Sequence, residues 1–244
     1  MTNCGYSVSY NDLTTMSYGR LGETGEKGMY HWIEDKQFLG RMKSLCSDIV
    51  NQLVQAINND GALIVNRHLV GSGAKNLITQ NANQPIDLDY NLEIIEYREF
   101  SINDCRAIKE YVRKKFNEVL NKNGWGDCSD STSALTTEER CFTEGNKTGF
   151  SIDLCIVRKG SFGSWQRLIH QKTGNVWFDQ YLWNEARQSS GLEDRIRWLK
   201  ENGCWLEVRE TYLKKKNMYL SQGDHDHPSF IVYIEAVNEV YAKH

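Results

Sequence analysis

The stretch that most constrains the fold is residues 86–95, which read IDLDYNLEII. Apolar residues alternate with polar ones here, and successive side chains of a strand point to opposite faces. The apolar set is Leu88, Tyr90, Leu92 and Ile94, and the polar set is Asp87, Asp89, Asn91 and Glu93. The pattern predicts a half-buried strand with an apolar face and a face rich in carboxylates.

The remaining elements are predicted from hydrophobic periodicity and turn residues. Apolar residues at three-to-four spacing over 38–57 indicate a helix that ends at Asn58-Asn59-Asp60-Gly61. We expect strands at 62–70 and 150–157, a tight turn at 71–73, a brief helix and loop over 74–84, a helix from 101 to 122 and a last helix over 229–242. The tryptophan-rich stretch after Gly160 has a helical texture.

This order of elements predicts an α+β fold with a mixed β-sheet flanked by helices and a helical cap at the C-terminus. We place the boundary near Gly160. The expected organisation is an irregular lead over 1–28, a core over 29–160 and a cap over 161–244.

Composition excludes several classes of protein. With 244 residues, 40% hydrophobic and 25% charged, the chain is neither disordered nor short of a core. A formal net charge of −3 argues against a basic nucleic-acid coat. No apolar stretch of about 18 residues is present, so we expect no membrane partner. The N-terminus lacks a secretory pattern, and seven scattered cysteines without a CxxC pair indicate reduced thiols in a cytoplasmic protein.

Acidic residues carry the candidate chemistry. Asp87 and Asp89 project from the same side of their strand, about 6–7 Å apart at Cα, and repel each other when ionised. A divalent cation relieves that repulsion, and oxygen ligands suit Mg²⁺. The alternative is the plain polar face of an edge strand. A second strand brings one more carboxylate, Asp153, between apolar neighbours.

In three segments the sequence resembles the DNA polymerase β-type nucleotidyltransferase superfamily. The segments are Leu69-Val70-Gly71-Ser72, Ile86-Asp87-Leu88-Asp89-Tyr90 and Ile152-Asp153-Leu154, and the resemblance covers roughly residues 38–157. The spacer between the first two is longer than in many members. Gly73-Ala74-Lys75 stands where an aromatic or Arg-rich continuation is commoner.

The resemblance implies transfer of a nucleotide from an NTP to an acceptor hydroxyl, with release of pyrophosphate. It implies two Mg²⁺ ions held by Asp87, Asp89 and Asp153, and an NTP whose phosphates lie against Gly71 and Ser72. Lys75 either reaches a phosphate or is a solvated lysine at a helix start.

The acceptor stays open: a nucleotide, an RNA, a small molecule or a protein. Residues 156–217 hold more Lys and Arg than Asp and Glu, which favours a nucleotide or RNA. The alternative function is a non-catalytic nucleotide- or RNA-binding module that retains the fold. The cluster Asp224-His225-Asp226-His227 has spacing suited to a transition metal, but alternate histidines in a loop are more often solvent-exposed.

Overall fold

The computed structural model describes residues 28–160, 164–185, 191–224 and 228–244. The irregular lead expected over 1–28 lies, except for Gly28, outside the described residues. The same holds for His225, Asp226 and His227 of the candidate metal cluster.

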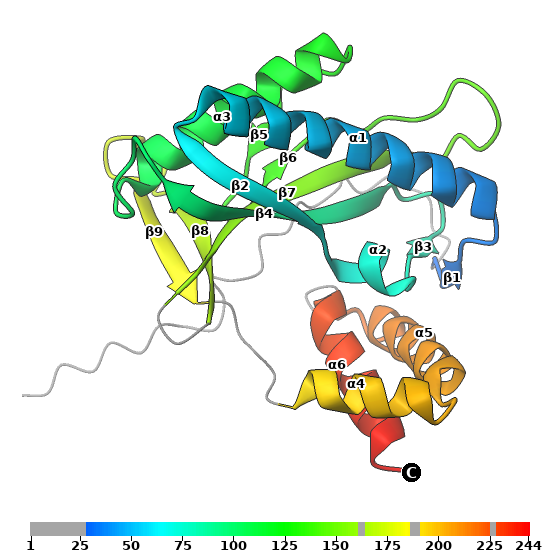
Figure 1. Cartoon of the computed structure of the whole chain (residues 1–244). Coiled ribbons are helices and arrows are strands. Elements are labelled where there is room, and N and C mark those ends of the chain that lie inside the picture. The colour runs from blue at the N-terminus through cyan, green and yellow to red at the C-terminus, as the bar shows by residue number, and fades with distance from the viewer. Residues whose placement is uncertain (1–27, 161–163, 186–190, 225–227) are drawn as a thin grey trace, which may run out of the picture.

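A seven-stranded sheet forms the centre of the structure (Figure 1). Its strands are β2 (Leu63–Leu69), β4 (Ile86–Tyr97), β5 (Ser129–Asp130), β6 (Leu135–Thr136), β7 (Phe150–Lys159), β8 (Trp165–Gln171) and β9 (Gln180–Glu185). The order is β2-β4-β7-β6-β5, with β8 pairing with both β7 and β9. The β4–β7 pair is parallel and the other described pairs are antiparallel, so the sheet is mixed, as predicted. A separate two-stranded sheet joins β1 (Tyr30–Trp32) to β3 (Thr79–Asn81).

Two long helices, α1 (Lys36–Asp60) and α3 (Cys105–Lys122), cover one face of this sheet (Figure 1). The Asp35 side chain accepts a hydrogen bond from the Phe38 N–H at 2.8 Å and caps α1. Gly61 ends the helix at φ +82°, a left-handed conformation that favours glycine. The predicted helix over 38–57 is therefore confirmed, with about one more turn in total.

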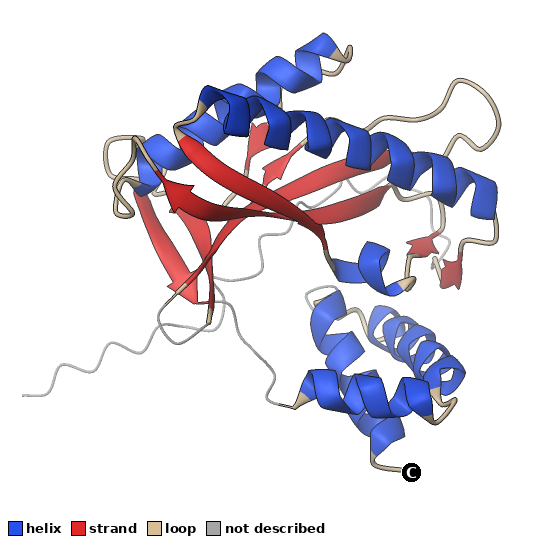
Figure 2. Cartoon of the chain, in the orientation of Figure 1, coloured by secondary structure: helices blue, strands red, loops and turns tan. Residues whose placement is uncertain are grey.

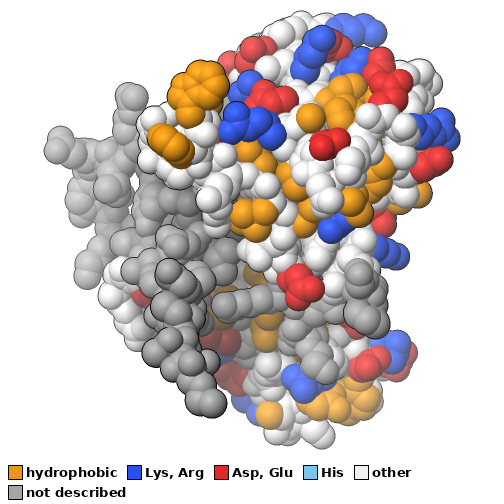
Figure 3. Space-filling model, turned by 90° about the vertical axis from the view of Figure 1, so that its left-hand side faces the viewer, with side chains coloured by type: hydrophobic (Ala, Val, Ile, Leu, Met, Phe, Trp, Pro, Cys, Tyr) orange, Lys and Arg blue, Asp and Glu red, His pale blue; other side chains and the backbone are white. Residues whose placement is uncertain are grey.

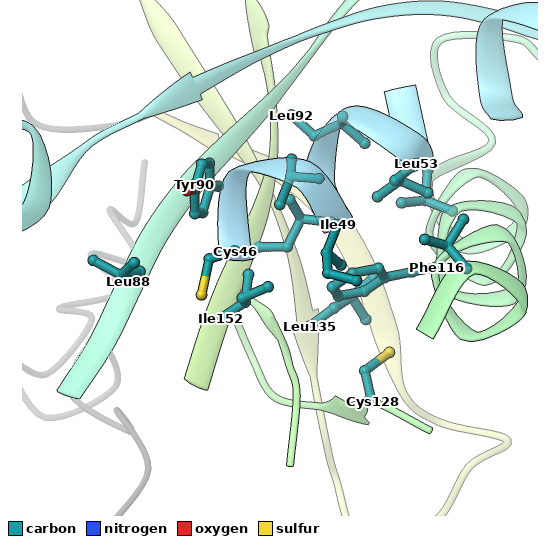
Figure 4. Packing of buried hydrophobic residues seen from close by; sticks show 14 of the residues in the cluster. Cys46, Ile49, Leu53, Leu88, Tyr90, Leu92, Phe116, Cys128, Leu135 and Ile152 are labelled. Carbon is teal, nitrogen blue, oxygen red and sulfur yellow. The ribbon is translucent and has the colours of Figure 1, made fainter. Parts of the chain in front are cut away.

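The main core lies between these helices and the sheet. Residues of α1, α3, β4, β6 and β7 interlock there, among them Cys46, Ile49, Leu53, Leu88, Tyr90, Leu92, Phe116, Leu135 and Ile152 (Figure 4). The Tyr90 hydroxyl lies 2.9 Å from the Ser47 Oγ of α1. The apolar set of β4 thus faces the helices, so its aspartates face the opposite side.

Local boundaries differ from the sequence prediction at two places. Helix α2 (Gly71–Lys75) begins at the predicted tight turn instead of after it. The 101–122 helix begins at Cys105, because Asp104 accepts the Ser101 N–H at 2.8 Å with its side chain and closes the turn before the helix.

The expectation of helical structure directly after Gly160 was wrong. Strands β8 and β9 extend the sheet, and the helices α4 (Leu192–Glu201), α5 (Trp205–Ser221) and α6 (Ser229–Tyr241) follow (Figure 2). The alternation of β8 is hard to recognise because the buried face carries a polar residue, His170. The three helices pack around a second apolar cluster, and the predicted last helix is confirmed. No helix in the described part of the chain is long and apolar enough to cross a membrane.

Candidate functional site

The parallel pairing of β4 with β7 brings the three predicted aspartates together. In this register Asp89 lies directly opposite Asp153, and Asp87 lies opposite Ser151. Residues paired across a sheet project to the same face. Since Leu88 and Ile152 face the helices α1 and α3, the aspartates share the opposite face of the sheet.

The carboxylates repel one another. Burial raises the pKa of Asp89 to about 7, and the negative charges of Asp153 and Asp87 act in the same direction. Burial also raises the pKa of Asp153, with Asp87 adding to the shift and a hydrogen bond from Thr136 opposing it. Burial and the neighbouring carboxylates therefore disfavour the ionised forms of Asp89 and Asp153.

Two hydroxyl groups hold two of the carboxylates. Thr136 Oγ1 of β6 donates to Asp153 Oδ1 at 2.5 Å, and Ser151 Oγ of β7 donates to Asp87 Oδ1 at 2.5 Å. The sequence places Ser151 on the face of Asp153, two residues away. It gives no signal for Thr136, which reaches the site only because β6 pairs with β7.

The turn before α2 lies against the same carboxylates. The Val70 N–H donates to the Asp89 backbone oxygen at 2.9 Å. Gly71 adopts φ +62°, and a Cβ built there would lie 2.2 Å from Asp89 Oδ2. The position requires glycine for its conformation and for its closeness to the carboxylate. Ser72 follows as the second residue of α2, directly after the glycine that lies against Asp89.

Two cations, Lys75 and Arg167, interact with the aspartates, and a third lies on α5; the sequence had singled out Lys75. Burial lowers the pKa of Lys75, while attraction to Asp89 opposes that shift. The Arg167 guanidinium on β8 attracts both Asp89 and Asp153, and sequence reasoning missed it because β8 itself was missed.

The third cation, Lys216, comes from α5. It donates to Thr79 Oγ1 at 3.0 Å and lies 3.8 Å from the ring centroid of Tyr30. Burial lowers its pKa to about 8. Lys216 lies in the basic segment 156–217, and α5 thus brings one of its positive charges to the small β1–β3 sheet.

The donor set fits a hard divalent cation in its chemistry, because it consists of three carboxylates, of which Asp89 and Asp153 are withdrawn from solvent. In the ranges that the structure describes, no three His, Cys, Asp or Glu side chains form a ready group of metal ligands. The site therefore offers suitable ligands without a preformed cage.

The similarity of this chain to known proteins lies in its structure. No family model matches the sequence, and no curated protein matches it. Among solved structures, CdnC of E. coli MS115-1 with ATP superposes with a TM-score of 0.55 at 14% identity, covering 86% of this chain and 62% of that one. The Vibrio cholerae DncV in its 3′-deoxy ATP bound form gives a TM-score of 0.56 at 10% identity, covering 88% and 68%.

A further structure is Vibrio cholerae DncV, a cyclic AMP-GMP synthase, with nonhydrolyzable GTP. It superposes with a TM-score of 0.51 at 12% identity, covering 88% of this chain and 68% of that one. The present chain thus spans a little under two thirds of CdnC and slightly more of DncV. The chain therefore shares the fold of CdnC and DncV. This fold is the α+β arrangement of a mixed sheet flanked by helices that the sequence predicted.

Proposed function

We propose that this protein transfers a nucleotide from an NTP to an acceptor hydroxyl and releases pyrophosphate. The observation that carries the proposal is the pairing of Asp89 with Asp153 beside Asp87, on a sheet face that also meets the Gly71–Ser72 turn. The likeness to proteins described with ATP, 3′-deoxy ATP and GTP supports an NTP as substrate.

In this mechanism Asp87, Asp89 and Asp153 hold two Mg²⁺ ions. When bound, such ions stabilise the attacking and leaving oxygens of an in-line displacement at phosphorus. The Gly71–Ser72 turn and the Lys75 ammonium hold the phosphates of the NTP. Arg167, which attracts both paired aspartates, adds positive charge beside them.

A nucleotide is the favoured acceptor, with RNA, a small molecule and a protein as the other candidates. One of the similar structures is described as a cyclic AMP-GMP synthase. The basic bias of residues 156–217 points the same way. We further propose a cytoplasmic location, where NTPs are available. The cysteines of the described segments are all free thiols, consistent with a reducing compartment.

One face of the protein argues against the RNA-binding alternative. On the face seen in Figure 3, acidic and basic side chains of the described residues are interspersed, with hydrophobic ones between them. An RNA-binding surface is expected to gather one sign of charge along the backbone path. RNA affinity that falls steeply with salt and survives loss of the aspartates would support the alternative.

The test is product analysis with each labelled NTP and Mg²⁺. We expect pyrophosphate and a nucleotide product identified by mass. Asp89→Asn should abolish both while the circular dichroism spectrum is unchanged. Asp194→Asn, which changes an exposed carboxylate on α4, is the matched control and should leave turnover intact. NTP binding without pyrophosphate release in the unaltered protein would favour the non-catalytic module instead.

A further inference from the structure

A small hairpin outside the predicted site contacts one of its aspartates. Strands β5 and β6 pair over only two residues each, yet β6 delivers the Thr136 hydroxyl to Asp153 Oδ1. Two-residue strands have little stability of their own. The position of Thr136 therefore depends on the pairing of β6 with β7, where Thr136 lies opposite Asp153, and on the contacts that hold the β5 end of the hairpin.

A buried ion cluster, formed by Lys109, Asp130, His170 and Asp179, holds the β5 end of the hairpin. Lys109 Nζ of α3 lies 2.6 Å from Asp130 Oδ1, and the two ring nitrogens of His170 lie 2.7 Å from Asp130 Oδ2 and 2.9 Å from Asp179 Oδ2. All four side chains are less than a tenth exposed.

The cluster also binds the hairpin backbone. Lys109 Nζ donates to the Ser131 oxygen at 2.9 Å, and the His170 backbone N–H donates to the Thr132 oxygen at 2.7 Å. Asp130 itself belongs to β5. The cluster thus connects α3, β8 and the segment before β9 to one end of the hairpin, and Thr136 lies at the other end.

Burying charged groups costs free energy unless they are paired and hydrogen-bonded, so such clusters are poor devices for stability alone. Such a cluster can instead fix a hydroxyl that binds a metal-ligating carboxylate. A carboxylate with one oxygen fixed by a hydrogen-bond donor presents its other oxygen in a defined direction. Thr136 does this for Asp153, whose register partner is Asp89.

We propose that Thr136 is a positioning residue that orients Asp153 for a divalent cation, and that the buried ion cluster acts on the site through the hairpin that carries Thr136. The proposal rests on the proposed function. It gives the buried ion cluster a role in the site, although none of its four residues is one of the three proposed metal ligands.

The first experiment measures Mn²⁺ affinity, from the electron paramagnetic resonance signal of the free ion, with the full chain and no nucleotide. Thr136→Val should weaken binding about tenfold. Thr136→Ser, which keeps the hydroxyl, should restore it. Thermal unfolding of the metal-free Thr136→Val protein should stay close to that of the unaltered protein.

Thr137→Val is the matched control. Thr137 is buried whereas Thr136 is half-buried, and the Thr137 hydroxyl accepts the Ile152 N–H at 2.9 Å instead of contacting a carboxylate. This variant should lower the unfolding temperature and keep the Mn²⁺ affinity. A purely structural role of Thr136 would give both residues the same result, and that outcome would overturn the proposal.

The second experiment tests the connection to the buried ion cluster. Asp179→Asn should weaken Mn²⁺ binding about threefold. Combined with Thr136→Val, it should add nothing to the loss, because both changes act through the same hydroxyl. Additive losses would refute the route through the hairpin.

Failure of the proposed function gives a different pattern. In that case the unaltered protein binds no Mn²⁺ at the site, and Asp153→Asn changes nothing. If Asp153→Asn abolishes binding while Thr136→Val binds normally, the metal site stands and only the role of Thr136 is wrong.

Discussion

At the scale of single residues, Asp89 shows the cost of assembling this site. Its side chain is drawn out of water and lies among two other carboxylates, so its ionised form is disfavoured in the folded protein. A pKa that is raised in the folded state means that folding takes up a proton between the two pKa values. Stability then falls as the pH rises through that interval.

We therefore predict that ionisation of Asp89 makes the unfolding free energy of the metal-free protein smaller at pH 8 than at pH 5. The pKa rises from 3.8 to about 7, so the loss falls within that window and amounts to a few kcal/mol at most. Urea unfolding in the presence of EDTA measures it. Asp89→Asn should flatten the profile over this range; an unchanged profile would show that Asp89 ionises freely.

Some of these residues were visible in the sequence and others were not. Alternation alone placed Asp87 and Asp89 on one face, and their spacing implied mutual repulsion. Thr136 and Arg167 gave no comparable signal, because their closeness to the site follows from the pairing of β6 and β8 with the sheet. Pairing of short strands over long sequence separation is not encoded in local periodicity.

At the scale of elements, the turn into α2 joins conformation to electrostatics. Gly71 needs a positive φ, and its α-carbon lies so close to Asp89 that a methyl group would collide with Oδ2. Gly124, after α3, also has a positive φ, but a methyl group there would point into open space, with nothing beyond its chain neighbours within 4 Å. The two glycines therefore separate the conformational requirement from the steric one.

We predict that Gly124→Ala costs about 1 kcal/mol of unfolding free energy and leaves NTP turnover unchanged. Gly71→Ala should cost about 2–3 kcal/mol and reduce turnover strongly, because Asp89 must move. Urea unfolding and a pyrophosphate-release assay give the two quantities. Equal effects of both changes on turnover would contradict the steric argument.

Strands β8 and β9 show where sequence prediction of elements failed. An inner face that carries His170 breaks the alternation of apolar and polar residues by which a half-buried strand is recognised. That histidine is acceptable inside because Asp130 and Asp179 bind its two ring nitrogens. By contrast α1, β4 and β7 pack against each other mainly through apolar side chains, and their positions were predicted well.

At the scale of the whole molecule, two apolar clusters meet close to the proposed phosphate site. Leu77 follows α2 but is buried in the cluster formed by α4, α5 and α6. Lys75, two residues earlier, lies 5.2 Å from the ring centroid of Tyr233 on α6. The turn that is expected to hold the phosphates is thus attached to the three C-terminal helices, α4, α5 and α6.

We predict that Leu77→Ala lowers the unfolding free energy by about 2–4 kcal/mol and also weakens NTP binding severalfold. Val240→Ala shortens a fully buried side chain of the same cluster, near the C-terminal end of α6 and seven residues beyond Tyr233. It should reduce stability by about 1–2 kcal/mol without affecting NTP binding. Isothermal titration calorimetry with a nonhydrolyzable NTP distinguishes the two variants. Equal NTP affinity in both would mean that α4, α5 and α6 do not support the turn.

The parallel pairing of β4 with β7 also has a consequence for synthesis of the protein. Parallel strands require a crossover connection, and here α3 and the β5–β6 hairpin lie between them. The ribosome therefore synthesises Asp87 and Asp89 well before it reaches the codon for Asp153. The three aspartates can meet only after the crossover has closed, so under the proposed function a translation product that ends before β7 consumes no NTP.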